Sequence, residues 1–510
     1  MSENSSQDIA ALAKGGRTNF FGFLLRLAGT APFLFIAGRA YGVEALGRYA
    51  SALVIVELTS QLCALGQRRG LAQRLAEDER PHAHVIADGM ILSLVLGIAA
   101  ALLFFVFPAP MFPSGEYSRW DRLLPLAILP NALTDIALAG LAYRYDVAAT
   151  VRARSIVEPW TMAIMAVALF SFIPEGGLAL SYIIAKTAAA AVALWPLLKA
   201  FGLPHHWRPH PLRTWRLALA SSPLAGADMV EWGSRKLDIA ILGMVASPRA
   251  VGVYYAAQQI ASLPQKLKTS FEPILGPVIT RNLKEKNYAA IALQVCQVGF
   301  WITAAQAGIA LSLGVPGEAV MGLVGKTFVG GTGALNLLLL AEVVAATAVV
   351  SEAALIYMAR LKNLAVSLCT IALQAALTIT FVLLIPKMPD MNLPFGIKVP
   401  RDHVANWQSA GAAAALMLSL AFASITKGFI LSRVLGQRIN NWRWSLIVAV
   451  VPALAAGYVV TRLLPHWLQL IVGVPFILLT YGTIIWRWGF GPDDRVLFRR
   501  NVAGKAQESA

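Results

Sequence analysis

The charged side chains that could do chemistry gather most densely between residues 228 and 238. Four of them are spaced 3, 4 and 3 residues apart and so fall on one stripe of a helix, with Lys236 beside it: Asp228, Glu231, Arg235 and Asp238. Glu231 and Arg235 form an i, i+4 pair, so this stripe is either a self-compensating ladder of ion pairs or the wall of a polar cavity. We favour the cavity, because four charges on one stripe cannot face lipid.

Other ionisable side chains stand alone in apolar surroundings, where each costs about 2.5–3.5 kcal/mol and therefore suggests a function. Glu57 lies about nine residues from one end of its apolar stretch, near mid-membrane. It is either a proton or cation site or a structural partner for Arg26 or Arg235. Weaker candidates follow the same logic: Gln61, Asp135, Lys186, Gln258 and Gln259.

Composition shows which elements must carry these side chains. Of 510 residues, 57% are hydrophobic and 14% are charged, and the 43 Lys and Arg exceed the 27 Asp and Glu by 16. This composition excludes a soluble globular protein, a disordered chain and a disulfide scaffold. We predict an all-α polytopic membrane protein with about fourteen spans, at 19–40, 44–66, 83–107, 121–143, 155–174, 178–202, 217–245, 250–277, 288–314, 333–358, 363–386, 408–426, 443–464 and 466–487.

The distribution of basic residues predicts the orientation. With the N-terminus in the cytoplasm, and residues at span ends assigned to the adjoining loops, 27 Lys and Arg fall inside and 10 outside. One inside cluster is Arg144, Arg152 and Arg154. We therefore predict a multi-pass protein with both termini in the cytoplasm. All three cysteines fall within spans, and no ligand spacing predicts a metal site.

An internal repeat appears when the sequence is shifted by 205 residues. Residues 45–49, Ala-Leu-Gly-Arg-Tyr, fall on residues 250–254, Ala-Val-Gly-Val-Tyr. The offset covers six expected spans, an even number, so both copies point the same way through the membrane. We predict two parallel six-helix lobes around a central cavity, as in an alternating-access transporter. The N-lobe would cover 1–205 and the C-lobe 206–436, and 437–510 would add two helices and a basic cytoplasmic tail.

Several segments resemble bacterial polysaccharide flippases of the multidrug/oligosaccharidyl-lipid/polysaccharide (MOP) exporter superfamily. They are the hairpin at 38–49, the segments 238–243 and 251–257 with Pro273 and Pro277, the segment 324–331, and Pro386 followed by the helix start at 411–413. An insertion of roughly twenty residues after Pro386 departs from the family pattern. Fourteen spans also exceed the twelve of many members and equal the number in the related lipid II flippases.

The resemblance implies that the chain moves an undecaprenyl-diphosphate-linked oligosaccharide from the cytoplasmic to the periplasmic leaflet of the bacterial inner membrane. A diphosphate needs fixed cationic donors when it leaves water. The candidates for this cationic cavity are Arg26, Arg235, Lys236, Lys266 and Lys268. For the lysines at 266 and 268, an equal alternative is that they reach the cytoplasmic interface. Expected partners are the lipid-linked glycan, membrane lipids and polymerase or export machinery, with no nucleic acid.

Transport against a gradient needs energy, and the sequence offers no nucleotide-binding motif. Residues 325–327, Gly-Lys-Thr, are not a P-loop because Val320 stands where that motif needs glycine. We therefore expect ion coupling and no cofactor, and the acidic candidates for it are Glu57, Asp228, Glu231 and Asp238. The alternatives are a drug or cation antiporter of the same superfamily, a lipid II flippase and, less favoured, a membrane glycan polymerase or ligase.

Overall fold

The computed structural model describes residues 25–269, 279–280, 282–385, 392–393, 397–398, 404–491 and 494, but not the side chains of 231, 234, 235, 264–269, 392–393 and 397–398. The chain divides into two compact units, Met1–Tyr255 and Ala256–Ala510. The division at residues 205 and 436 that the repeat suggests stays a prediction.

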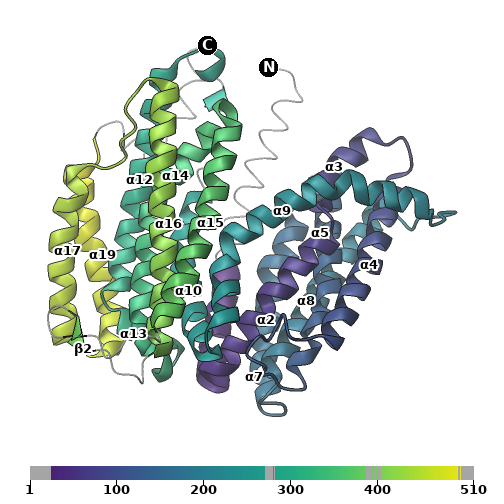
Figure 1. The fold of residues 1–510 in the computed structure, drawn as a ribbon, viewed down its shortest axis with the longest axis horizontal. Coiled ribbons are helices and arrows are strands. Elements are labelled where there is room, and N and C mark those ends of the chain that lie inside the picture. Colours follow the sequence, from purple (N-terminus) through teal and green to yellow (C-terminus); the bar gives the residue numbers. More distant parts are fainter. Residues whose placement is uncertain are drawn as a thin grey trace. The chain divides into compact units, whose positions relative to one another are not determined.

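The first unit is a bundle of helices, with α4, α5 and α8 side by side (Figure 1). Its elements in chain order are η1 (Ala37–Tyr41), α2 (Gly42–Cys63), α3 (Gln67–Glu77), α4 (His82–Val106), η2 (Asp121–Ala127), α5 (Ile128–Tyr143), α6 (Val147–Thr150), η3 (Val151–Val157), α7 (Glu158–Phe170), α8 (Gly177–Phe201) and α9 (Pro211–Val245). Gly42 at the start of α2 and Gly66 just after its end have positive φ angles, which residues with a Cβ rarely adopt. These two glycines let the chain change direction on either side of α2.

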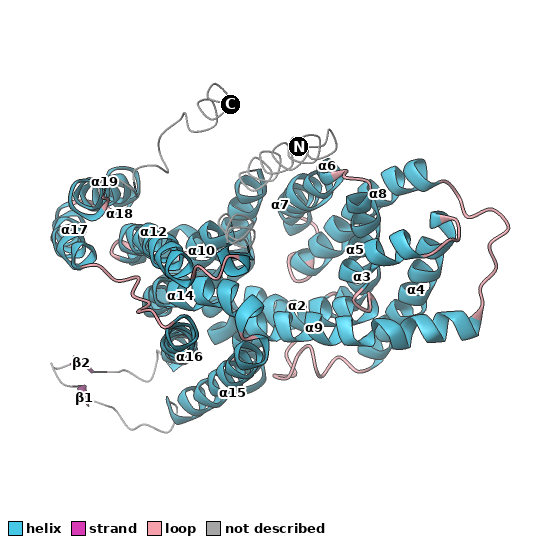
Figure 2. Ribbon diagram, turned by 90° about the horizontal axis from the view of Figure 1, so that it is seen from above, coloured by secondary structure: helices cyan, strands magenta, loops and turns pink. Residues whose placement is uncertain are grey.

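The second unit is also helical and begins within α10 (Pro248–Thr269). Its further elements are α12 (Tyr288–Gly314), α13 (Gly317–Val324), η4 (Lys326–Gly331), α14 (Thr332–Met358), α15 (Arg360–Leu384), α16 (Val404–Leu435), α17 (Trp444–Leu463), α18 (His466–Leu468), η7 (Gln469–Gly473), α19 (Val474–Ile484) and η8 (Ile485–Gly489). Within the described ranges the only strands are β1 (Asn392–Leu393) and β2 (Ile397–Lys398), an antiparallel pair in the insertion after Pro386 (Figure 2).

The all-α membrane fold is confirmed, but the count of fourteen spans is not. The described residues contain 11 helices that are long and apolar enough to cross a membrane. One of them, Leu25–Glu77, holds both the first and the second expected span. The seventh and eighth expected spans correspond to α9 and α10, which are not among the 11 and whose sequences carry the charged stripe and several lysines.

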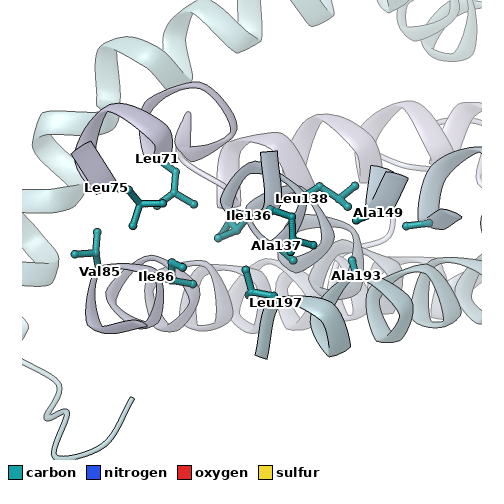
Figure 3. Close-up of a cluster of buried hydrophobic side chains, with 12 residues drawn as sticks. Leu71, Leu75, Val85, Ile86, Ile136, Ala137, Leu138, Ala149, Ala193 and Leu197 are labelled. Carbon is teal, nitrogen blue, oxygen red and sulfur yellow. The ribbon is translucent and has the colours of Figure 1, made fainter. Parts of the chain in front are cut away.

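Each unit is held together by apolar packing between helices. In the first, Leu71 and Leu75 of α3 pack with Ile86 of α4, Ile136 of α5 and Leu197 of α8 in one buried cluster (Figure 3). In the second, side chains of α17 and α19 form a buried cluster with α12. The two C-terminal helices therefore pack on the second unit, against α12.

A salt bridge ties the chain beyond these helices to the same unit. Asp494 accepts hydrogen bonds from Arg443 Nη1 at 2.6 Å, from Trp301 Nε1 at 2.9 Å and from the Gly491 amide at 2.9 Å. Burial alone would raise the pKa of Asp494, but these donors together lower it below the ordinary value of 3.8. The carboxylate is therefore ionised at neutral pH and holds the chain after η8 against Trp301 of α12.

The two copies of the repeat meet through a reciprocal contact inside the first unit. A Cβ added to Gly47 would overlap the carbonyl oxygen of Pro248, and one added to Gly252 would overlap that of Val43. The offset of 205 maps Val43 onto Pro248 and Gly47 onto Gly252, so each glycine meets the equivalent of the residue that the other glycine meets. Such self-complementary contacts are what a two-fold axis between two equivalent elements produces. This geometry supports the repeat found in the sequence.

Candidate functional site: a buried ion network in the first unit

Arg154 is the centre of an ion network between helices of the first unit. It lies in η3, a π-helical segment between α6 and α7, and such wide turns often occur at functional sites. Its guanidinium donates to Asp135 of α5 at 2.5 Å, to Glu158 of α7 at 2.9 Å and to the Asn131 side chain at 2.8 Å. Arg154 therefore joins α5 to the helix that carries Glu158.

A second cation completes the network from α8. Lys186 is 4% exposed, and its Nζ lies 2.8 Å from Glu158 Oε1, while Arg154 binds Oε2 of the same carboxylate. The Asn131 amide donates to Ser60 of α2 at 2.8 Å, which extends the polar connection to a further helix. Two acids and two bases thus neutralise one another in a part of the unit where unpaired charge is costly.

Glu57 of α2 lies beside this network without joining it. Tyr49 and Tyr182, whose ring centroids are 5.9 Å apart, interact electrostatically with both Glu57 and Glu158. Within the described part of the chain Glu57 makes no ion pair, and its side chain is half-buried. A carboxylate near a neutral network but not paired within it is a candidate to bind a proton or a metal cation.

Two further sequence candidates lie in the same region. Arg26 is exposed and interacts electrostatically with Glu158. Gln61 is half-buried one helical turn after Glu57. The structure therefore brings Arg26, Asp135 and Lys186 into electrostatic or direct contact with one network, with Glu57 at its margin.

Asp228 and Asp238 of α9 have partners outside that network and different from one another. Asp228 is 4% exposed, and its carboxylate lies 2.7 Å from Arg69 and 3.6 Å from Arg68, both on α3. Asp238 is 1% exposed and accepts hydrogen bonds from the Tyr254 hydroxyl at 2.5 Å and from the Ile239 amide at 2.8 Å. Asp228 is therefore an ion-pair partner of α3, whereas Asp238 joins α9 to α10.

The remaining candidates are less defined. Lys236 is half-buried and interacts electrostatically with Asp238, and Gln258 and Gln259 are half-buried on α10. Four predicted residues lie outside the side chains that the structure describes: Glu231, Arg235, Lys266 and Lys268. Their roles stay predictions.

Sequence reasoning missed Arg154 and Glu158 as site residues. The sequence predicts a cytoplasmic basic cluster that includes Arg154, because the fifth expected span starts at residue 155, whereas the helical segment begins at Val147. The available signal was the i, i+4 spacing of Arg154 and Glu158, which is the same pattern that drew attention to Glu231 and Arg235.

The second unit holds an ion pair that the sequence also does not predict. Lys427 of α16 is 4% exposed, and its Nζ lies 2.9 Å from Glu352 of α14 and 3.1 Å from the Ser367 hydroxyl of α15. The expected span ends at residue 426, one residue before Lys427, whereas α16 continues to Leu435. Lys427 links three helices of the second unit.

Comparison with solved structures defines the class of fold. The lipid II flippase MurJ in an inward closed conformation gives a TM-score of 0.69 at 12% identity, covering 96% of this chain and 100% of that one. An inward-facing multidrug resistance MATE family transporter of the MOP superfamily gives 0.61 at 12% identity, covering 80% and 94%. A MOP superfamily transporter from Pyrococcus furiosus gives 0.52 at 13%, covering 84% and 95%. The fold is that of MOP superfamily transporters.

Sequence comparison identifies the family within that class. A family model described as a polysaccharide biosynthesis protein matches residues 36–303, more than half of the 510-residue chain. The chain belongs to this family of polysaccharide biosynthesis proteins, which confirms the family resemblance found in its residues. No curated protein sequence matches it.

Proposed function

We propose that this protein flips undecaprenyl-diphosphate-linked oligosaccharide repeat units from the cytoplasmic to the periplasmic leaflet by alternating access. The product would serve exopolysaccharide, O-antigen or capsule synthesis. The observation that carries the proposal is a network of ionised side chains within the membrane-spanning helices of a chain from a polysaccharide biosynthesis family. Its location would be the bacterial inner membrane with both termini in the cytoplasm, and polymerase or export machinery would receive the flipped lipid.

The cationic candidates would receive the diphosphate. Arg154 and Lys186 are already neutralised by Asp135 and Glu158, so they would orient helices and not bind cargo. Arg26 is exposed and Lys236 is half-buried, so both remain available to an anionic ligand. Guanidinium and ammonium groups replace the water lost by a phosphate when it enters a less polar environment.

Ion coupling would supply the energy through an acidic side chain. Glu57 is the best candidate because it is half-buried, lies near the Arg154 network and makes no ion pair within the described part of the chain. A proton or sodium ion bound there would cancel one negative charge close to Glu158. That change would alter the electrostatic balance of the first unit in each transport cycle.

The substrate proposal is tested in cells that lack the gene. Loss of surface polysaccharide, with lipid-linked repeat units accumulating where periplasmic reagents cannot reach them, is the expected result. Accumulation on the periplasmic side would instead support a polymerase or ligase. Restored peptidoglycan synthesis in cells depleted of their lipid II flippase would support the lipid II alternative. The MurJ-like fold is the reason to test this alternative.

The coupling proposal needs a separate measurement in liposomes. With Glu57→Gln we expect transport of the lipid-linked glycan to lose its dependence on an imposed proton or sodium gradient. Gln61→Glu is the matched control, because it leaves the acid at 57 and adds one a turn away. Gradient-dependent transport that survives Glu57→Gln unchanged would refute the role of Glu57. Export of cationic drugs against the same gradients would favour the antiporter alternative, which the MATE-like fold suggests.

A further inference from the structure

A second place in the first unit can bind a ligand, and it is separate from the ion network. A cavity of about 760 Å³ opens on the surface where α5 ends at Tyr143, α6 begins at Val147 and α8 ends at Phe201. That volume falls within the range of about 300–1,000 Å³ that is usual for small-molecule sites. Because it lies at the ends of spanning helices, it is at the border between membrane and water.

Three basic side chains line this groove from three elements. They are Arg144 after α5, Arg152 in η3 and Lys199 near the end of α8, and the only acid in the lining is Asp146. Asp146 caps α6 by accepting from the Ala149 amide at 3.0 Å and lies 3.5 Å from Arg152. The lining therefore carries a surplus of positive charge and attracts an anion.

Of the three basic groups, Arg144 is held in place without being neutralised, and Lys199 also has no acidic partner within the described residues. Arg144 donates to the carbonyl oxygen of Ala200, and its guanidinium lies 5.3 Å from the centroid of the Phe201 ring. Neither contact supplies a negative charge. Within the described residues Lys199 makes no ion pair, and its side chain is exposed. Two cations without an acidic partner, at Arg144 and Lys199, favour a ligand that brings its own negative charge.

The rest of the lining is apolar and continues along the helix. Leu141, Ala191, Val192, Trp195 and Pro196 form the remaining wall. Trp195 is 75% exposed and stands six residues before the end of α8, the depth at which tryptophan concentrates in membrane proteins. Two exposed apolar residues lie on the same face of α8 as Trp195, in the direction of the membrane centre. Ala191 is one turn from Trp195, and Ile184 is two turns further.

We propose that this groove binds one anionic phospholipid, with the phosphodiester headgroup between Arg144, Arg152 and Lys199 and the acyl chains along Ala191 and Trp195. Basic pockets between spanning helices recognise anionic lipid headgroups by the same chemistry. A free phosphate would use the cations but leave the apolar wall uncovered, so the lipid fits the whole surface. The site is independent of the transported cargo and of the proposed function.

The full-length protein in phosphatidylcholine nanodiscs provides the test. Phosphatidylglycerol is titrated in, and bound lipid is counted by native mass spectrometry. Each of Arg144→Gln, Arg152→Gln and Lys199→Gln should weaken binding about fivefold, and the triple variant about 100-fold. The matched control removes three exposed cations from the second unit, at Arg360, Lys362 and Arg433, and should change binding less than about twofold. Equal loss in both triple variants, or no loss in the groove variant, would overturn the proposal.

A second variant separates lipid binding from simple charge attraction. Ala191→Trp keeps every charge and fills the apolar wall from an exposed position, so it should weaken phosphatidylglycerol binding by about tenfold. Unchanged binding would overturn the proposal. Inorganic phosphate at the same concentrations should not displace the lipid, and displacement would mean a site for a free anion. If undecaprenyl diphosphate binds the groove more tightly than phosphatidylglycerol, the groove is a site for the cargo and not for a phospholipid. That result would also overturn the proposal.

Discussion

The two copies of the repeated hairpin keep the same backbone contact but carry different chemistry at equivalent positions. In the first copy Phe33 packs edge-on against Tyr49, with ring centroids 6.1 Å apart. In the second copy the equivalent pair is Asp238 and Tyr254, joined by a hydrogen bond of 2.5 Å. All four side chains are buried. A pair of positions can therefore hold two helices together either by ring packing or by a hydrogen bond to a carboxylate.

The copies also differ in where they hold their ion pairs. The first copy pairs Arg48 of its hairpin with Asp121 and places its buried network on later helices, at Arg154, Glu158 and Lys186. The second copy carries acids in the hairpin itself, and a separate ion pair at Lys427 and Glu352. Backbone geometry has been retained where two glycines allow close approach, whereas polar chemistry has diverged. Function that depends on charge is therefore expected to be asymmetric between the copies.

The largest expected effect comes from breaking the network of the first copy. Arg154→Leu leaves Asp135 without its salt bridge and Glu158 with only Lys186. Removing one partner of a buried ion pair costs about 3–5 kcal/mol of folding free energy. Chemical unfolding in detergent micelles measures this cost. The control is the same substitution at Arg433, which is exposed and whose guanidinium lies over the Phe429 ring. A stability equal to that of the unaltered protein would contradict the structural role of Arg154.

Breaking the shared backbone contact should have the next largest effect. Gly47→Ala and Gly252→Ala each introduce a Cβ onto a backbone carbonyl, and overpacking of this kind costs about 1–3 kcal/mol. Because the contact is reciprocal, the two costs should be similar. Gly226→Ala in α9 is the matched control, since its Cβ would meet nothing within 4 Å and alanine favours a helix. A much larger loss of stability at one glycine than at the other would contradict a two-fold symmetric contact between the copies.

The difference between the hairpins themselves is tested at the two tyrosines. Tyr254→Phe removes the hydroxyl that binds Asp238, and loss of a hydrogen bond to a charged group costs about 1.5–3 kcal/mol. Tyr49→Phe keeps the ring that packs on Phe33, so its effect on the unfolding free energy should be much smaller. Equal effects of the two substitutions would show that the hairpins are held in the same way.

The smallest effect is expected at the ion pair of the second unit. Lys427→Met should cost about 1 kcal/mol, because the Glu352 side chain is 42% exposed and water screens the pair. Met keeps the apolar length of the buried lysine. A cost comparable to that of Arg154→Leu would show that the second unit depends on its charges as strongly as the first.

The fold could be predicted further from the sequence than the site could. Apolar stretches of spanning length recur along the chain, and the equivalence of Gly47 and Gly252 is visible in aligned letters. The ion network could not be derived, because Asp135, Arg154 and Lys186 come from three different helical segments and no sequence spacing connects them. The helical start at Val147 also moved Arg154 from a presumed loop into a spanning segment.

By itself the sequence determined that the protein is an all-α membrane protein with a repeated hairpin, because hydropathy and helical spacing are local properties. It also drew attention to Asp135, Lys186 and Glu57 as charges in costly places. Only the tertiary structure decided that the first two belong to one neutral network, that Asp228 pairs with α3, and that Arg144, Arg152 and Lys199 share a groove. Such partners are decided by helix packing, which brings together residues far apart in the chain and determines which charges are neutralised.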